Sequence, residues 1–273
     1  MPELPEVESV RRHLAPRLEG RAIVAVWSAP QERFGVLDDA VGRRINALGR
    51  RGKYLLADLS GDLELVLHLG MTGAFRFHGE RAADGSAWLG DPYVRASFTL
   101  DDGSVLDFRD VRRFGRLTVV PRGDYTAIPT LAQLGPEPLS EQFDAADFYA
   151  ALRRTRAAVK PFLLSQRPVA GVGNIYADEA LWRARISPLA RRVGRERAQR
   201  LWAAIRVVLA DAIEREGTTF RDYQMVNGQS GRNAAFLVAY GKRGSPCARC
   251  GTPLAKIVLG GRGTTYCPGC QRY

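Results

Sequence analysis

The chain opens with apolar residues at helical spacing and continues with apolar residues in short alternating runs. Val7, Val10, Leu14 and Leu18 fall on one helical face, and Pro5 stands near the first helical position, where proline is favoured. The pattern therefore predicts one amphipathic helix at the start of the chain, ahead of a region of different periodicity.

Between that helix and about residue 120, β-rich runs alternate with turn residues. Short strands at this density are typical of a β-sandwich or a barrel. Asp101-Asp102-Gly103, between two of the runs, predicts a hairpin turn. The runs predicted as strands are Ala22–Trp27, Lys53–Leu59, Leu63–Leu69, Ala74–Phe77, Arg95–Leu100, Val105–Phe108 and Arg116–Val120.

The second half of the chain shows helical periodicity instead. A proline-bearing stretch at 129–140 predicts a linker between the two halves. We therefore divide the chain into a β-rich domain (2–128), the linker, a helical domain (141–236) and a C-terminal segment (237–273). The predicted helices are Ala145–Arg156, Pro161–Ser165, Ile175–Ala184 and Arg195–Glu216.

Composition narrows the class of protein. With 45% hydrophobic and 25% charged residues, the chain is typical of a soluble globular protein. The acidic, proline-bearing start is unlike a secretory signal peptide. Arg206 and Asp211 interrupt the apolar stretch Leu201–Ile213, so no membrane-spanning segment is predicted. We therefore expect a cytoplasmic protein.

The charge of the chain is unevenly distributed. Forty lysine and arginine residues stand against 29 acidic ones, for a formal net charge of +11. Residues 1–140 hold 18 basic and 19 acidic side chains, residues 141–236 hold 16 and 10, and residues 237–273 hold six and none. A basic second half suits a polyanion such as DNA or RNA. An arginine-rich surface that only keeps the protein soluble has the same composition.

All four cysteines lie near the C-terminus, as Cys247-x2-Cys250 and Cys267-x2-Cys270 with 16 residues between the pairs. This is the spacing of a zinc ribbon, in which two tight turns bring four thiolates around one ion. Four protein ligands leave no open coordination position, so the predicted site is structural. The alternative is a pair of disulfides or unligated thiols, which a reducing compartment and this spacing disfavour.

Two other segments carry more chemistry than a fold requires. Gly171 and Gly173 lead into a helix with Asn174 at its expected N-cap, and a helix N-terminus reached through glycines binds phosphate. Arg112-Arg113-Phe114-Gly115 places arginines beside an aromatic ring, which can enter a base stack when a nucleotide is extruded. Taken alone, an ordinary helix cap and a solvated arginine pair explain both segments.

In order and spacing, five motifs resemble those of the formamidopyrimidine-DNA glycosylases, from residue 2 to residue 270. Leu4 and the arginine–phenylalanine loop favour the branch that acts on oxidised purines over the related endonuclease VIII branch. The motifs are Pro2-Glu3-Leu4-Pro5-Glu6-Val7-Glu8, His68-Leu69-Gly70-Met71-Thr72-Gly73, Asp110-x-Arg112-Arg113-Phe114-Gly115, Gly171-x-Gly173-Asn174-Ile175-Tyr176-Ala177-Asp178-Glu179 and the four-cysteine ribbon.

The resemblance implies an α+β multidomain fold: an N-terminal β-sandwich with a leading helix, a helix–two-turn–helix domain and a C-terminal four-cysteine zinc-finger hairpin. It implies an enzyme that removes 8-oxoguanine and formamidopyrimidines from damaged double-stranded DNA and then cuts the strand by β,δ-elimination. One structural zinc ion, a monomeric chain and a place at the cytoplasmic nucleoid belong to the same expectation.

The resemblance also implies roles for individual residues. Pro2 is expected to supply the amine nucleophile, and Glu3 to act as the acid/base beside it. Lys53 is expected to bind phosphate and assist β-elimination, and Arg262 to bind phosphate and assist δ-elimination. The expected zinc ligands are Cys247, Cys250, Cys267 and Cys270.

The other expected DNA contacts form two groups. Met71, Arg112 and Phe114 are expected to fill the duplex where the nucleotide leaves the stack. The expected backbone contacts are His68, Tyr93, Arg156 and Asn174. For Glu6, a favourable interaction with the helix dipole is the simplest explanation.

Two alternatives stay open: an enzyme of the endonuclease VIII branch that acts on oxidised pyrimidines, and a non-catalytic damaged-DNA-binding paralogue. The Pro2–Glu3 pair favours catalysis, because a protein that only binds DNA needs neither a secondary amine nor an adjacent carboxylate. Residues 217–233, polar and glycine-bearing, are expected to close over the extruded base. An ordinary surface loop has the same composition.

Overall fold

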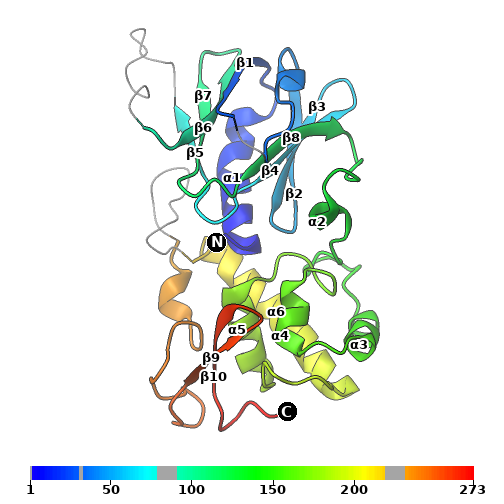
Figure 1. Cartoon of the computed structure of the whole chain (residues 1–273), viewed down its shortest axis with the longest axis vertical. Helices are drawn as coiled ribbons and strands as arrows, with labels where there is room; N and C mark the ends of the chain where they lie inside the picture. Colours follow the sequence, from blue (N-terminus) through cyan, green and yellow to red (C-terminus); the bar gives the residue numbers. More distant parts are fainter. Residues whose placement is uncertain (1, 31–32, 79–90, 219–230) are drawn as a thin grey trace. The chain divides into compact units, whose positions relative to one another are not determined.

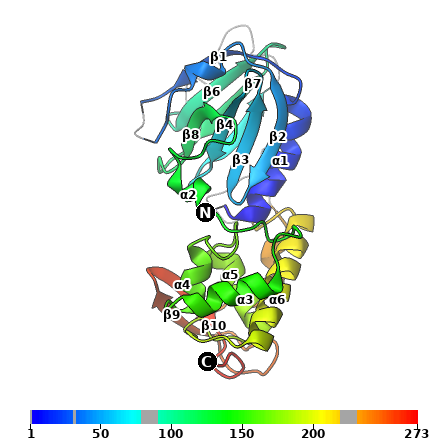
Figure 2. The same ribbon diagram turned by 90° about the vertical axis from the view of Figure 1, so that its right-hand side faces the viewer.

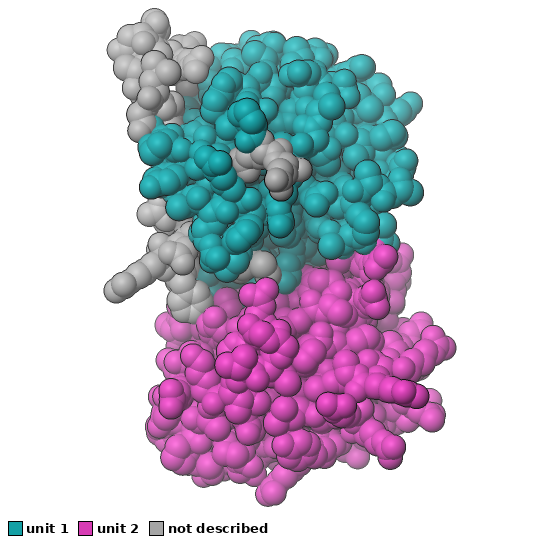
Figure 3. Space-filling view, in the orientation of Figure 1, with its two compact units in different colours: residues 1–132, 216–231 teal, residues 133–215, 232–273 magenta. Residues whose placement is uncertain are grey.

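The computed structural model describes residues 2–30, 33–78, 91–218 and 231–273. The chain separates into two compact units, drawn in different colours in Figure 3. Unit 1 contains residues 1–132 and 216–231, and unit 2 contains residues 133–215 and 232–273. The first boundary lies within the predicted linker, and the C-terminal hairpin groups with the helices of unit 2.

Unit 1 is built from two antiparallel four-stranded sheets (Figure 1). The first sheet contains, in order, β1 (Ile23–Ser28), β6 (Val94–Leu100), β7 (Val105–Arg109) and β5 (Ala74–His78). The second contains, in order, β2 (Ile45–Arg51), β3 (Tyr54–Leu59), β4 (Leu63–His68) and β8 (Arg116–Pro121). The predicted turn at Asp101-Asp102-Gly103 joins β6 to β7, with Gly103 at a φ of 81°.

Helix α1 (Leu4–Leu18) packs against β2 and β3 (Figure 2). Its apolar face is buried, with Val10 at 1% and Leu14 at 0% exposure. These side chains join one core cluster with Leu55 and Phe108, which come from different sheets. Because burial of apolar surface drives folding, this shared core holds the helix to the sandwich. The predicted β-sandwich with a leading helix is confirmed.

Strand β2 is not predicted by the sequence pattern. Its buried positions, Ile45 and Leu48, are three residues apart, whereas a regular strand alternates with a period of two. An irregularity in the pairing of Ile45 and Ala47 with β3 produces this spacing. The strand is therefore defined by its pairing with β3 rather than by its own alternation.

Unit 2 is mainly helical. Helix α6 packs against both α3 and α5 (Figure 2), and a hairpin of β9 (Ala255–Leu259) and β10 (Arg262–Tyr266) contacts α5. In the described parts of both units, no helix has the length and apolar character needed to cross a bilayer. The helices of unit 2 are α3 (Ala145–Arg154), α4 (Val159–Leu164), α5 (Asn174–Ala184), α6 (Arg195–Glu214) and the 3-10 turn η2 (Asn233–Phe236).

Several predicted helix boundaries differ from the structure by one or two residues. Helix α3 ends at Arg154 rather than at Arg156, and α4 spans Val159–Leu164 rather than Pro161–Ser165. Two further boundaries bear on the site. Helix α5 begins at Asn174, so Gly173 is its N-cap and Asn174 is its first residue. Helix α6 ends at Glu214, because Glu216 and Gly217 adopt left-handed φ values of 61° and 79° that a right-handed helix cannot continue. Short turns of helix also form where none is predicted, at η1 (Asp38–Ala40) and at α2 (Pro129–Ala132) within the linker.

Candidate functional site

The start of α1 buries Pro2 beside a carboxylate. Both Pro2 and Glu3 are buried, and Glu3 is the N-cap of the helix. The Glu3 N–H donates to Glu6 Oε2 at 2.8 Å, as part of a capping box. The box fixes the backbone of Glu3 and therefore the position of the adjoining Pro2.

Glu6 also holds a segment that is distant in sequence. Its Oε1 accepts a hydrogen bond from the Thr218 N–H at 2.6 Å. A Cβ at Gly217 would lie 2.7 Å from Glu6 Oε1, so glycine is required there. The helix dipole is thus an incomplete explanation of Glu6, whose carboxylate ties the base of residues 217–233 to α1. Residues 219–230, and with them the expected closure over a base, lie outside the described residues.

A cationic group lies at one end of the second sheet. Gly52 and Lys53 form the two-residue turn between β2 and β3, with Gly52 at a φ of 57°. His68, the last residue of β4, pairs with Tyr54 of β3 on one side and with Arg116 of β8 on the other. The strand register therefore brings the charges of Lys53 and Arg116 close to the imidazole.

His68 is held as a neutral hydrogen-bond donor. Burial, together with three nearby cations, lowers the pKa of His68 to about 4. The Gly70 N–H donates to His68 Nδ1 at 3.1 Å, so the proton of the neutral ring is on Nε2. A fixed Nε2–H surrounded by positive charge suits contact with a phosphate. The three cations are Lys53, Arg116 and Arg33.

A buried carboxylate shapes the loop between β7 and β8. Asp110 is 0% exposed, and its Oδ2 accepts a hydrogen bond from the Gly115 N–H at 2.7 Å. Its Oδ1 accepts from the Thr72 hydroxyl at 2.6 Å and from the Arg112 N–H at 3.3 Å. One side chain therefore fixes both ends of Arg112–Gly115 and attaches the turn at Thr72 to the same point.

Close packing also holds the turn at residues 70–73 against the loop at residues 112–115. Gly70 has a φ of 63°, and a Cβ there would lie 2.5 Å from the carbonyl carbon of Phe114. Arg113 adopts a φ of 56°, a left-handed conformation that is uncommon for residues other than glycine. The strain is located in the loop that presents Arg112 and Phe114, and strain of this kind clusters at functional sites.

Phe114 lies between two guanidinium groups. That of Arg112 is 4.9 Å from the ring centroid, and that of Arg33 is 5.6 Å away. Met71 belongs to the turn that packs on this loop, so the structure gathers the three residues predicted to enter the duplex. Sequence reasoning missed Arg33, because no motif marks it and only a bridge from its neighbour to β8 brings it here.

Tyr93 lies just before β6, and its side chain is 39% exposed. Its ring centroid is 4.9 Å from the guanidinium carbon of Arg109 and 5.9 Å from that of Arg95. Its carbonyl accepts a hydrogen bond from the Asp110 N–H at 2.9 Å. Tyr93 is therefore accessible next to the Asp110 loop, where its contact with DNA stays a prediction.

In unit 2, a buried ion pair joins α4, α5 and the hairpin. Lys160 Nζ lies 2.6 Å from Asp178 Oδ1, and both side chains are at most 1% exposed. Lys160 also donates to Thr264 Oγ1 at 2.9 Å, and Asp178 Oδ2 accepts from the Thr265 N–H at 2.9 Å. Burial raises the pKa of Asp178 to about 6 against the opposing effect of Lys160, so the carboxylate is mainly ionised at neutral pH.

Asn174 and Arg262 lie beside this network. Asn174 Nδ2 donates to the Gly263 carbonyl at 3.0 Å, and its Oδ1 is buried without a hydrogen-bond partner among the described residues. Arg262 is exposed and begins β10, directly after a turn formed by Gly260 and Gly261 at positive φ. The second Nδ2 hydrogen of Asn174 and the guanidinium of Arg262 are therefore available to a ligand.

Glu179, also on α5, holds the segment that leads to the cysteines. Its buried carboxylate accepts hydrogen bonds from the backbone N–H groups of Val238, Ala239 and Tyr240 at 3.1, 2.9 and 2.8 Å. Burial raises the pKa of Glu179, while the three N–H groups favour its ionised form. The segment after η2 is thereby anchored on the same helix that carries Asn174.

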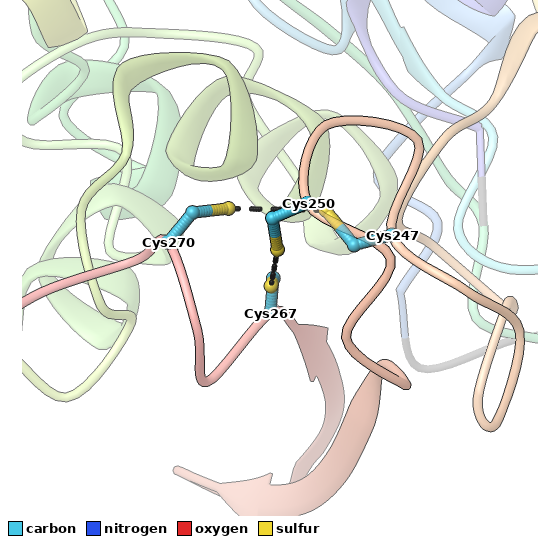
Figure 4. Close-up of side chains that lie close together, drawn as sticks. All are labelled: Cys247, Cys250, Cys267 and Cys270. Carbon is cyan, nitrogen blue, oxygen red and sulfur yellow. Dashed lines mark hydrogen bonds between the residues drawn. The ribbon is translucent and has the colours of Figure 1, made fainter.

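The four cysteine sulfurs converge on one point (Figure 4), all within 4.8 Å of one another. The sulfurs of Cys247 and Cys270 are 3.8 Å apart, and those of Cys250 and Cys267 are 3.4 Å apart. Tetrahedral zinc with Zn–S bonds of about 2.3 Å needs sulfurs about 3.8 Å apart. The donor set and its geometry therefore fit one structural zinc ion.

Helix α5 supplies an outer contact to these sulfurs. The Trp182 indole N–H donates to Cys247 Sγ at 3.3 Å. Arg249 packs its guanidinium carbon 4.1 Å from the Trp182 ring centroid and donates to Cys270 Sγ at 3.7 Å. Four thiolates around Zn²⁺ carry excess negative charge, which an N–H donor and a cation both stabilise. Sequence reasoning missed both residues, since neither belongs to the ligand pattern.

The predicted site residues are thus divided between the two units. Arg156 is exposed between α3 and α4, where it lines a cavity with other arginines and takes no part in the contacts of Asn174 or Arg262. Unit 1 contains Pro2, Glu3, Lys53, His68, Met71, Tyr93, Arg112 and Phe114, and unit 2 contains Arg156, Asn174, Arg262 and the four cysteines.

Three family models match the chain. They are described as the formamidopyrimidine-DNA glycosylase N-terminal domain, over residues 1–117, the formamidopyrimidine-DNA glycosylase H2TH domain, over residues 134–224, and a zinc finger found in FPG and IleRS, over residues 244–272. The last match agrees with the sulfur geometry, and the four cysteines hold one structural zinc ion.

Relatives match over the full length. A formamidopyrimidine-DNA glycosylase of Deinococcus radiodurans is 46% identical, with 99% of this chain and 97% of the relative aligned. The crystal structure of the MutM (Fpg) protein from Thermus thermophilus superposes with a TM-score of 0.91 at 46% identity, covering 99% of this chain and 98% of the other. A structure of MutM in complex with carbocyclic 8-oxo-G containing DNA superposes with a TM-score of 0.88 at 34% identity, covering all of both chains.

We predict that His68 stays neutral from pH 8 down to about pH 5, because its pKa is lowered to about 4. In the unfolded chain the imidazole has a pKa near 6.5 and binds its proton first. Acidification from about pH 6.5 to about pH 4 therefore removes stability from unit 1. Histidine NMR titration measures this directly, with the His68 signal identified by its loss in His68→Asn. A His68 midpoint near 6.5 would contradict the prediction.

We predict that Trp182→Phe speeds the loss of zinc to a chromophoric chelator by about 10- to 100-fold, as the removal of other outer contacts of metal ligands does. Trp202→Phe is the matched control, because the Trp202 indole N–H donates to the Phe143 carbonyl and not to a cysteine. Equal rates of zinc loss in the two variants would show that the indole–sulfur bond has no effect on the metal.

Proposed function

The chain belongs to the formamidopyrimidine-DNA glycosylase family, and we propose that it carries out excision through Pro2 and Glu3. It is a base-excision repair enzyme with two activities, a DNA glycosylase for oxidised purines and a lyase that cuts the strand at the resulting abasic site. The observation that carries the residue assignment is the burial of Pro2 and Glu3 at the N-terminus of α1, on a backbone fixed by Glu6.

The chemistry requires a free secondary amine at Pro2, which removal of Met1 exposes. An α-amino group has a pKa of about 7.7–8.0, against about 10.4 for a lysine side chain, so more of it is unprotonated at neutral pH. Attack of this nitrogen on the sugar C1′ expels the damaged base and gives an aminal, with loss of the amine proton. Protonation of the ring oxygen O4′ then breaks the C1′–O4′ bond and opens the sugar, which leaves an iminium ion between Pro2 and C1′. Glu3 is placed to move protons to and from the sugar and the leaving base as general acid and base.

The iminium then makes strand cleavage possible. Its positive charge acidifies the sugar hydrogens at C2′, so that a base can remove one and the 3′ phosphate leaves by β-elimination. A second elimination releases the 5′ phosphate. We assign Lys53 and His68 in unit 1, and Asn174 and Arg262 in unit 2, to the phosphates around the lesion.

Extrusion of the damaged nucleotide leaves a gap in the base stack, and we assign the insertion residues to fill it. Met71, Arg112 and Phe114 lie on two turns locked together by Asp110, so the chain holds them in one arrangement before DNA arrives. The solved complex of MutM with carbocyclic 8-oxo-G containing DNA supports purines over pyrimidines as the substrate class. The substrate also supports a place of action at the nucleoid.

We predict that borohydride traps a covalent protein–DNA adduct at Pro2. Glu3→Gln should keep affinity for lesion DNA but lose base excision by at least about 100-fold, since general acid–base catalysis contributes that much or more. Peptide mapping of the adduct and single-turnover excision of 8-oxoguanine measure the two effects.

A form that retains residues before Pro2 is the control, because its proline nitrogen is an amide and cannot attack. This form should fail in both excision and trapping while binding DNA normally. An adduct at Lys53 in active enzyme with Pro2 blocked would overturn the assignment.

We predict that Phe114→Ala slows excision of 8-oxoguanine from intact duplex by about 10- to 100-fold and slows cleavage at a preformed abasic site much less. Extruding an intact base costs a few kcal/mol of unstacking, which the inserted ring offsets, whereas an abasic site has no base to unstack. Arg113→Ala is the matched control, because the guanidinium groups over the Phe114 ring belong to Arg112 and Arg33. Equal losses on the two substrates would exclude insertion as the role of Phe114.

A further inference from the structure

A cavity of about 700 Å³ in unit 2 is lined by four arginines, and we call it the arginine cavity. Arg153 and Arg156 come from the end of α3 and the segment after it, and Arg191 and Arg192 come from the segment before α6. All four side chains are exposed. The other lining residues are Tyr149, Leu152, Thr155, Val193 and Gly194.

Among the described residues, the four guanidinium groups have no acidic partner. No carboxylate of the described residues lies within 4.0 Å of them, whereas on the neighbouring α6 Arg200 lies 2.5 Å from Glu196 and Arg215 lies 3.9 Å from Asp211. Like charges gathered around one cavity repel each other, and a bound anion converts that repulsion into attraction.

Helix dipoles explain only part of this arrangement. Arg153 lies in the last turn of α3, where a cation is favoured. Arg191 and Arg192 precede the N-terminus of α6, where the positive end of the dipole disfavours them. A Cβ at Gly194, the N-cap of α6, would meet no atom within 4 Å, so this helix end is open to a ligand. A bound anion would therefore offset the unfavourable position of the two arginines.

Arg156 is already an expected backbone contact, and we infer that Arg191 and Arg192 extend it, so that the arginine cavity binds the sugar–phosphate backbone of DNA at a contact separate from Asn174 and Arg262. The inference rests on the proposed function, which makes DNA the ligand. Guanidinium groups bind phosphate oxygens in bidentate fashion, and a volume of about 700 Å³ is larger than one phosphate needs. Leu152 and Val193 give the cavity an apolar wall that suits deoxyribose.

The test compares salt dependence of binding in the full-length, zinc-loaded protein. An undamaged 30-base-pair duplex is titrated by fluorescence anisotropy between 50 and 300 mM salt with the wild type and with Arg191→Ala/Arg192→Ala. Each phosphate contact contributes about 0.9 to the slope of log K against log salt, so the double variant should lose about two units of slope. Affinity at the lowest salt should fall about tenfold or more.

Two further variants separate local contact from net charge. Arg154→Ala/Arg167→Ala removes two exposed arginines of the same unit that do not line the cavity, and it should keep nearly the whole slope. Arg191→Lys/Arg192→Lys keeps the charge and should restore most of the slope. Zinc content and circular dichroism confirm that each variant is folded.

Three outcomes would overturn the inference. The first is an equal loss of salt slope in Arg191→Ala/Arg192→Ala and Arg154→Ala/Arg167→Ala, and the second is no loss of slope in Arg191→Ala/Arg192→Ala. The third is that Arg191→Ala/Arg192→Ala weakens binding of tripolyphosphate but leaves binding of the duplex unchanged. Single-turnover excision of 8-oxoguanine at saturating protein should be the same in the wild type and in the control variant Arg154→Ala/Arg167→Ala. If the wild type itself excises no lesion, the proposed function fails, while the backbone contact is still decided by the undamaged duplex.

Discussion

A buried carboxylate must find hydrogen-bond donors, and this requirement organises four functional segments of the chain. Glu6 accepts from the backbone of Glu3 and Thr218, and Asp110 accepts from Arg112, Gly115 and Thr72. In unit 2, Asp178 accepts from Thr265 and pairs with Lys160, and Glu179 holds residues 238–240. Each carboxylate would be costly to bury unpaired, so each loop is held in the one conformation that satisfies it.

For the catalysis that we propose, the consequence is that the assigned residues are positioned before DNA binds. Proximity lowers a barrier only when the reacting groups are already oriented, and loops that carry arginine and phenylalanine are ordinarily mobile. Here the left-handed Arg113 is maintained because Asp110 fixes the residues on both sides of it. The same principle applies at the zinc site. The ion would order the β9–β10 hairpin that carries Arg262, and Trp182 links the site to α5.

Much of the fold and of the candidate site could be predicted from the sequence. The cysteine spacing, the glycine turns and seven of the eight strands of the sandwich each have a local sequence pattern. What could not be predicted depends on partners distant in the chain. The irregular pairing of β2, the commitment of Asn174 to the Gly263 carbonyl and the hydrogen bond from Thr218 to Glu6 each need the folded register. The contacts of Arg33 and Trp182 could not be predicted for the same reason, because only tertiary packing places these residues beside Phe114 and Cys247.

Segment charge was a poor guide to where phosphate contacts would lie. Residues 1–140 hold 18 basic and 19 acidic side chains, which suggests no anion site, yet Lys53, Arg33 and Arg116 all act on His68. Many acidic groups of this segment are engaged elsewhere, as Glu8 is with Arg11 and Arg50. A phosphate responds to the charges within about a Debye length, roughly 8 Å in physiological salt, and not to the sum over a domain. The cationic surroundings of His68 in unit 1 are therefore produced by tertiary pairing, which gathers like charges that the sequence keeps apart.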